Sequence, residues 1–223
     1  KWNNGGVLRL LTYEDLDGIN VSSSGGTALN PGNWQYSRVI DDTGPVTSSV
    51  VRLQDKRTKK LWVYFGTGRY FFKLSTVIDD SDKVRALYGL KDPCYDNGAF
   101  LASCTGISYT PSQLAAVDLT IPDGVTDDEG WKISLDDCAS LAGTPVACTS
   151  AYFRTERVIT NPLSLSTGVV FFTTLKPYDD ICSSGGNTAI WAVKYDTGGA
   201  PGTLLQGKAL IQVSTGAIEQ LDL

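Results

Sequence analysis

The sequence predicts an all-β protein assembled from blades of a β-propeller. Three observations predict it. Apolar and polar residues alternate with period two in segments rich in β-branched and aromatic residues. Turn-forming residues, among them 23 Gly and 9 Pro, separate these segments. An imperfect internal repeat places three strand-like segments in the same order twice, as blades of a propeller do.

Nine segments carry the strand pattern, and Gly, Asp or Pro stands between most of them. The expected strands are 6–12, 46–54, 61–67, 84–91, 131–136, 156–163, 167–175, 188–195 and 208–220. We expect 61–67 and 169–174 to be central strands of two neighbouring blades. A single helix is expected, over 111–118, because Pro111 suits a first helical turn.

The repeat units cover about 46–92 and 158–196. Their three segments begin at Val46, Leu61 and Arg85 in the first unit and at Val158, Gly168 and Thr188 in the second. The corresponding starts are therefore 112, 107 and 103 positions apart. The segments therefore follow in the same order in both units, and the loops between them differ in length. The alternative is two similar sandwich hairpins without a repeat relationship.

The length predicts an incomplete propeller. At about 45 residues per blade, the 223 residues make at most about five blades. Segments 93–130 and 137–155 read as insertions, which leaves strands for three or four. We treat 1–223 as one propeller segment. Since the chain also has no Met, we expect it to be a processed piece whose edge strands pair with another polypeptide.

Composition excludes several functions. With no His, catalytic triads that need an imidazole and His-ligated zinc sites cannot form on this chain. The net charge of −5 argues against nucleic acid as a partner. The one basic run, 56–60, reads as a hairpin tip. The longest apolar runs, 61–65 and 169–172, are too short to cross a bilayer, so the protein is not expected to be membrane-integral.

Five cysteines indicate disulfides. Cys94 and Cys104 are ten positions apart, as are Cys138 and Cys148, and each pair brackets a polar stretch. We predict local 94–104 and 138–148 bonds that staple the two insertions, with buried free thiols as the alternative. Cys182 then has no partner on this chain. Disulfides imply export to an oxidising compartment, such as the periplasm, cell surface or medium.

Several motifs resemble the PilY-type family in their order along the chain. In the first unit these are Pro45-Val-Thr, Trp62-Val-Tyr-Phe-Gly-Thr-Gly-Arg-Tyr70, the acidic loop at 79–82 and Leu87-Tyr-Gly-Leu-Lys-Asp92. Further along they are Gly130-Trp131, Glu156-Arg157-Val158, Phe171-Phe-Thr-Thr174, Pro177, Cys182-Ser-Ser-Gly-Gly186, Ala189-Ile-Trp-Ala192 and Asp196-Thr-Gly198. Each motif alone is weak, and the ordered set from about residue 7 to 198 carries the resemblance.

The resemblance implies a type IV pilus tip protein with a quinoprotein-like C-terminal propeller. Such proteins promote pilus assembly, counteract retraction and mediate attachment without catalysis. The implied location is the cell surface or pilus tip, or the periplasm and outer membrane. The implied partners are the N-terminal part of the parent protein and pilus or minor pilin subunits.

Calcium is the candidate ion. The family's Asp-rich calcium loop is absent, since Asp15-Leu-Asp17-Gly18 lacks the later carboxylates. Asp79, Asp80 and Asp82 form one candidate cluster, and 123–129 holds another; solvated acidic turns are the alternative for both. Exposed aromatics at 34, 36 and 70–72 could stack on sugars, although core packing explains most of them. The residues assigned to the core are Trp62, Tyr64, Phe171, Trp191 and Val193.

Two other functions stay open. A generic secreted domain that binds carbohydrate or protein would show glycan binding without association with pili. A fragment of a quinoprotein-like dehydrogenase would show quinone absorbance, but those enzymes use a vicinal cysteine pair that this sequence lacks.

Overall fold

The structure is a computed structural model that describes residues 5–12, 35–69, 73–74, 77–78, 85–101, 108–117, 124–126, 129–135, 155–177, 186–201 and 208–213. Within these ranges the regular structure is strand, apart from one 3-10 turn, so the all-β prediction is confirmed. Short strand pairs outside the main sheets are β5 (Lys73–Leu74) with β6 (Val77–Ile78) and β8 (Tyr95–Asp96) with β9 (Ala99–Phe100).

The first sheet has the strand order β10-β11-β7-β4-β3. Its strands are β3 (Val51–Asp55), β4 (Lys60–Gly66), β7 (Arg85–Lys91), β10 (Ala115–Ala116) and β11 (Gly130–Leu135). All neighbours are antiparallel except β10 and β11. The segment predicted at 61–67 is a central strand, because β4 pairs with β3 on one side and β7 on the other.

The second sheet repeats this order as β12-β14-β15-β16, with β13 also paired to β14. Its strands are β12 (Arg157–Val158), β13 (Leu163–Ser164), β14 (Val169–Pro177), β15 (Gly186–Lys194) and β16 (Lys208–Val213). The segment predicted at 169–174 is again central. Each sheet therefore gains a fourth antiparallel strand, β11 or β16, beyond the three in each sequence repeat.

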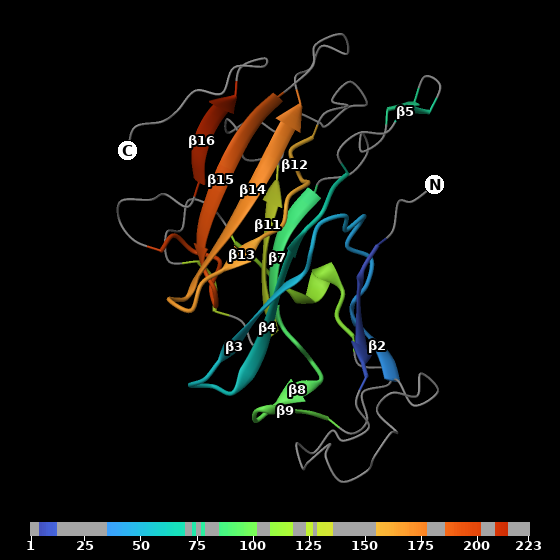
Figure 1. The fold of residues 1–223 in the computed structure, drawn as a ribbon, viewed down its shortest axis with the longest axis vertical. Coiled ribbons are helices and arrows are strands. Elements are labelled where there is room, and N and C mark those ends of the chain that lie inside the picture. Colours follow the sequence, from blue (N-terminus) through green and yellow to red (C-terminus); the bar gives the residue numbers. More distant parts are fainter. Residues whose placement is uncertain are drawn as a thin grey trace.

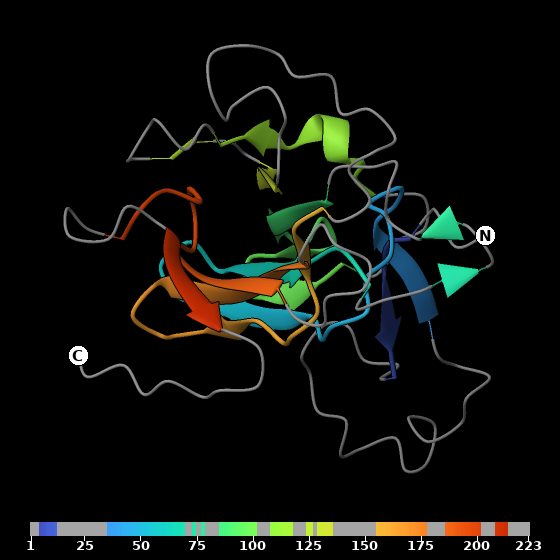
Figure 2. The ribbon, with the colours of Figure 1, turned by 90° about the horizontal axis from the view of Figure 1, so that it is seen from above.

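A hairpin of β1 (Val7–Leu11) and β2 (Gln35–Ile40) forms a third layer. Figure 1 shows the first sheet in the middle, with β14–β16 on one side and β1–β2 on the other. Seen from above, β16 and the hairpin again lie at opposite sides of the molecule (Figure 2). The central sheet is thus covered on both faces, which explains the unbroken apolar run Leu61–Phe65.

The two sheets pack face to face through one large core. It contains Trp62, Tyr64, Leu87, Val117, Trp131, Ile133, Leu135, Val158, Val170, Phe172, Ala189, Trp191 and Val193. The rings of Trp131 and Phe172 meet across the two sheets edge-to-face, 6.3 Å apart. Gly89 makes room for the Trp131 indole, since a Cβ there would lie 2.4 Å from two indole carbons. Burying each large side chain contributes about 1.5–3 kcal/mol.

The opposite face of the first sheet packs on the hairpin. This second core contains Val7, Val39, Ile40, Val63, Phe65, Ala86, Tyr88, Leu90 and Leu114. Phe65 and Tyr88 stack with ring centroids 4.9 Å apart. Alternate residues of β4 and β7 therefore enter different cores, as period two requires.

Two predictions about individual elements are wrong. The expected helix at 111–118 is one 3-10 turn, η3 (Pro111–Gln113), followed by β10. A helix this short gains few hydrogen bonds, whereas Ala115 and Ala116 gain a partner strand in β11. Phe171 is not in the core: it pairs with Ala192 on the outward face of β14, and its neighbour Phe172 is buried instead.

Candidate functional site

The predicted calcium ligands Asp79, Asp80 and Asp82 lie outside the described residues, as do Asp123, Asp127 and Asp128 of the second cluster, so calcium binding stays a prediction. Among the described residues there is no group of three or more potential metal-ligating side chains. No helix in the described ranges has the length and apolar character needed to cross a membrane.

Cys94 is fully buried and disulfide-bonded. Cys104, Cys138, Cys148 and Cys182 lie outside the described residues, so the 94–104 and 138–148 pairings stay predictions. Part of the predicted insertion at 93–130 joins the main fold: Leu114 is in the second core, and β10 adds to the first sheet.

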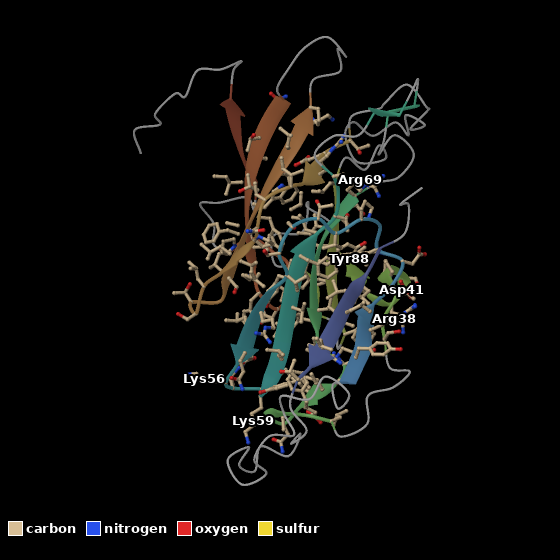
Figure 3. All side chains as sticks on the ribbon, turned by 45° about the vertical axis from the view of Figure 1, so that its right-hand side comes forward. Arg38, Asp41, Lys56, Lys59, Arg69 and Tyr88 are labelled. Carbon is tan, nitrogen blue, oxygen red and sulfur yellow. The ribbon has the colours of Figure 1, made fainter. Side chains whose placement is uncertain are left out.

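The motifs of the first unit meet those of the second at the upper joint between the sheets. The Val158 amide donates to the Thr67 carbonyl (3.0 Å), and Gly66 lies against the Val158 side chain. Arg157 donates to the Arg69 carbonyl (3.3 Å), and Figure 3 shows Arg69 at this end of the first sheet. These residues therefore join two sheets.

A buried polar network continues this joint inside the second sheet. The Glu156 carboxylate accepts from the Thr174 hydroxyl and from the Trp191 indole, the latter at 3.3 Å. The same indole lies 3.1 Å from the Thr174 hydroxyl. Since all three side chains are buried, this arrangement fixes strand β14 against β15 and presents no carboxylate to a substrate.

Tyr195 forms the lower joint. Its carbonyl accepts from the Tyr64 hydroxyl (3.1 Å) and from the Trp131 indole (3.0 Å), both on the first sheet. Burial and nearby anionic groups raise the pKa of Tyr64 far above its usual value, so its hydroxyl remains a donor. The Tyr195 hydroxyl donates to Asp55 (3.0 Å) and so reaches the turn between β3 and β4.

The β3–β4 turn carries the basic run at 56–60. Lys56, Arg57 and Lys59 are exposed on it, as the basic run predicted. Figure 3 shows Lys56 and Lys59 at the tip of this hairpin, away from both cores. Neither ammonium group forms a hydrogen bond or ion pair with the part of the chain that the structure describes.

Asp55 holds the turn in shape. Its carboxylate accepts from the Arg57 amide (2.8 Å), the Thr58 amide (3.3 Å) and the Thr58 hydroxyl (2.7 Å). Burial acts to raise the pKa of Asp55, but these bonds and the one from Tyr195 together lower it. The carboxylate is therefore ionised and engaged at neutral pH.

A second hairpin tip, β8–β9, lies beside the first (Figure 1). The Gly98 amide donates to the Lys59 carbonyl (3.1 Å), and Lys60 pairs with Asp96 (2.7 Å). The side-chain amide of Gln54 donates to the Tyr95 hydroxyl (2.8 Å). We call residues 54–60 and 95–98 the paired tips.

A buried ion pair between Arg9 and Asp92 anchors the base of the β8–β9 hairpin. Arg9, on β1, donates to both carboxylate oxygens of Asp92, and the Cys94 amide donates to the same carboxylate (2.8 Å). Burial raises the pKa of Asp92, against the lowering effect of the Arg9 guanidinium. The Arg9 guanidinium also lies over the Phe100 ring at 5.6 Å. The β8–β9 hairpin is thereby tied to the β1–β2 layer.

Sequence reasoning identified the basic tip but missed its partner. Residues 95–98 fell inside a predicted insertion, and no local signal placed Asp96 opposite Lys60. The positive φ of Asn97 (50°) and Gly98 (91°) marks a tight turn, for which an Asn-Gly pair is the usual signal. Asn97-Gly98 could therefore have revealed the hairpin, though not its position beside β3–β4.

No protein-family model, curated protein or solved structure matches this chain.

Proposed function

We propose that the chain is a run of blades from a modified, quinoprotein-like β-propeller, acting without catalysis as an attachment module at the tip of a type IV pilus. The observation that supports the propeller most directly is contact between equivalent positions of the two repeats. The Ser49 amide donates to the Asn161 side chain (2.9 Å), and the Ser164 hydroxyl donates to the Arg52 carbonyl (3.3 Å). Both pairs are 112 residues apart, which is the displacement of the first strands of the repeats.

Packing of further blades would also explain the exposed apolar side chains on the outward faces of the hairpin and the second sheet. On the hairpin, Leu8, Leu10 and Tyr36 are exposed, with 78% of Tyr36 accessible. On the second sheet, Phe171 is half-buried beside Leu163, which is exposed. In the proposed propeller, further blades from the rest of the parent polypeptide cover these faces.

The pilus location rests on the PilY-type resemblance, and several residues of its motifs join the two sheets. The motif residues Gly66, Thr67 and Glu156–Val158 form the upper joint, and the motif residue Trp131 donates to the Tyr195 carbonyl at the lower one. These residues have a structural role, which is the role expected in a non-enzymatic scaffold. Export to an oxidising compartment agrees with the disulfide at Cys94.

Deletion in the organism that encodes the chain tests this function. We expect loss of surface pili, counted by electron microscopy, and loss of attachment, both restored by the intact gene. Normal piliation and attachment in the deletion strain would overturn the proposal. A quinone absorbance band in the purified protein would favour a dehydrogenase instead.

A further inference from the structure

We propose that the paired tips bind an acidic polysaccharide, with Lys56 and Lys59 as its direct anion contacts. This inference rests on the proposed attachment function and names the ligand class of that function. It is carried by the charge, shape and chemical composition of the tips.

Charge is concentrated at this one turn. The paired tips hold four of the 19 basic residues, Lys56, Arg57, Lys59 and Lys60, and two of the 24 acidic ones, so the remaining chain has 15 basic against 22 acidic residues. Asp55 is engaged by the turn and Asp96 by Lys60, which leaves the two free ammonium groups at the tip. An anionic ligand is therefore drawn to the tip and repelled by much of the rest.

Lys59 occupies a backbone conformation that favours glycine. Its φ is 55°, in the left-handed region that costs a side-chain-bearing residue free energy. A residue kept in such a conformation at an exposed turn, where glycine would fit, points to a use for its side chain. The Asp55 bonds hold the backbone of the turn in one shape, so both lysines project from a fixed backbone before a ligand arrives.

The neighbouring groups suit a hydroxylated ligand. Gln54 and Asn97 are exposed, and Asn97 precedes Gly98, whose amide donates to the Lys59 carbonyl; the side-chain amides of both residues carry donor and acceptor atoms. Sugar hydroxyls donate and accept hydrogen bonds, so they match this mixture. Lysine ammonium groups on flexible stems bind carboxylates or sulfates at irregular spacing.

Other polyanions fit less well. Protein interfaces have an apolar centre, but none of the described exposed large hydrophobic side chains lies within 54–60 or 95–98. Single-stranded nucleic acid needs exposed rings for stacking, whereas the Tyr95 ring packs edge-to-face on Phe100 at 4.9 Å. Acidic polypeptide and DNA are therefore outcomes of the test.

The experiment measures binding of the full chain to polygalacturonate and heparin by biolayer interferometry at several salt concentrations. Dextran, polyglutamate and single-stranded DNA serve as comparison ligands. The double variant Lys56→Gln/Lys59→Gln removes the proposed contacts. Lys176→Gln/Lys194→Gln removes the same charge from the second sheet and controls for the loss of net charge alone. Thermal unfolding checks that each variant is folded.

We expect binding to at least one acidic polysaccharide, weakened about 30-fold by the tip variant, or about fivefold per lysine. The control should lose less than threefold, and dextran should not bind. Equal losses in both double variants, absence of binding, or tighter binding to polyglutamate or DNA would each overturn the proposal.

The two proposals fail separately. If the deletion strain loses its pili but the purified chain does not bind acidic polysaccharides, the pilus function stands and the proposal for the paired tips is wrong. If the tips bind polysaccharide but deletion leaves pili intact, the chain is a carbohydrate-binding domain of another kind.

Discussion

Gly66 lies directly against Val158, with no space for a side chain between them. A Cβ on Gly66 would be 2.2 Å from Cγ2 and 2.6 Å from Cβ of Val158. The two residues belong to different sheets and are held together by the adjacent bond from the Val158 amide to the Thr67 carbonyl (3.0 Å). The distance between the sheets at the upper joint therefore depends on the absence of one methyl group.

Gly66→Ala should separate the sheets at this joint. Because Val158 is fully buried and cannot move away, we expect a loss of about 3 kcal/mol in the free energy of unfolding, measured with urea. Gly98→Ala is the control: nothing lies within 4 Å of its Cβ position, so only its φ of 91° matters, at about 1 kcal/mol. Equal losses would show that the joint is not tightly packed.

The disulfide of Cys94 should close on Cys104. Peptide mapping without reduction is expected to recover residues 94 and 104 in one linked pair. Replacing both with Ser should lower the free energy of unfolding by about 3 kcal/mol on the chain-entropy model. A bond from Cys94 to Cys138, Cys148 or Cys182 would mean that the predicted loops are wrong.

Asp55 should make the free energy of unfolding decrease at acidic pH. Its pKa is lowered in the folded protein, so its ionised form contributes stability above about pH 3.9. That contribution is lost as the pH falls through the lowered pKa. Asp55→Asn should therefore lose less stability than the parent chain between pH 6 and pH 3, measured by urea midpoints.

Asp41→Asn is the control for this pH dependence. Asp41 is an exposed carboxylate paired with Arg38, outside the β3–β4 turn (Figure 3). Comparing it with Asp55→Asn separates the removal of one carboxylate from the removal of the bonds that Asp55 accepts. If the two variants show the same acid dependence, the bonds to Asp55 do not stabilise the turn.

Lys59→Gly should stabilise the fold while weakening the proposed ligand binding. Glycine relieves the left-handed strain at φ 55° but increases the entropy of the unfolded chain, so we expect a net gain of about 0.5–1 kcal/mol. The readout is the urea midpoint. Lys56→Gly, the neighbouring control, should give no gain, and a loss of stability in Lys59→Gly would contradict the conformational argument.

The exposed face of β1 should promote association of the isolated chain. Leu8 and Leu10 are 68% and 54% exposed. Replacing both with Thr, which keeps strand propensity, should shift the chain towards monomer in size-exclusion chromatography. Leu163→Thr on the second sheet tests the opposite face. If the parent chain is already monomeric at high concentration, the proposal that these faces are uncovered blade surfaces is contradicted.

The sequence alone determined the class of fold and the strands that lie inside the sheets. Alternation and β-branched content located β4, β7, β14 and β15, because strands buried by neighbours have strong apolar patterns. The basic run at 56–60 indicated a hairpin tip for the same local reason: five polar residues between two apolar strands are expected to form a turn.

Tertiary structure decided what local pattern leaves open. The period-two pattern of a strand places Phe171 and Phe172 on opposite faces of β14 but does not determine which of them faces the first sheet. In the structure Phe172 faces it and packs against Trp131. Ala115 and Ala116 became a strand because β11 offered an edge, and β2 was found only through its pairing with β1. The paired tips exist because the Gly98 amide reaches the Lys59 carbonyl, a contact between residues that no sequence period relates.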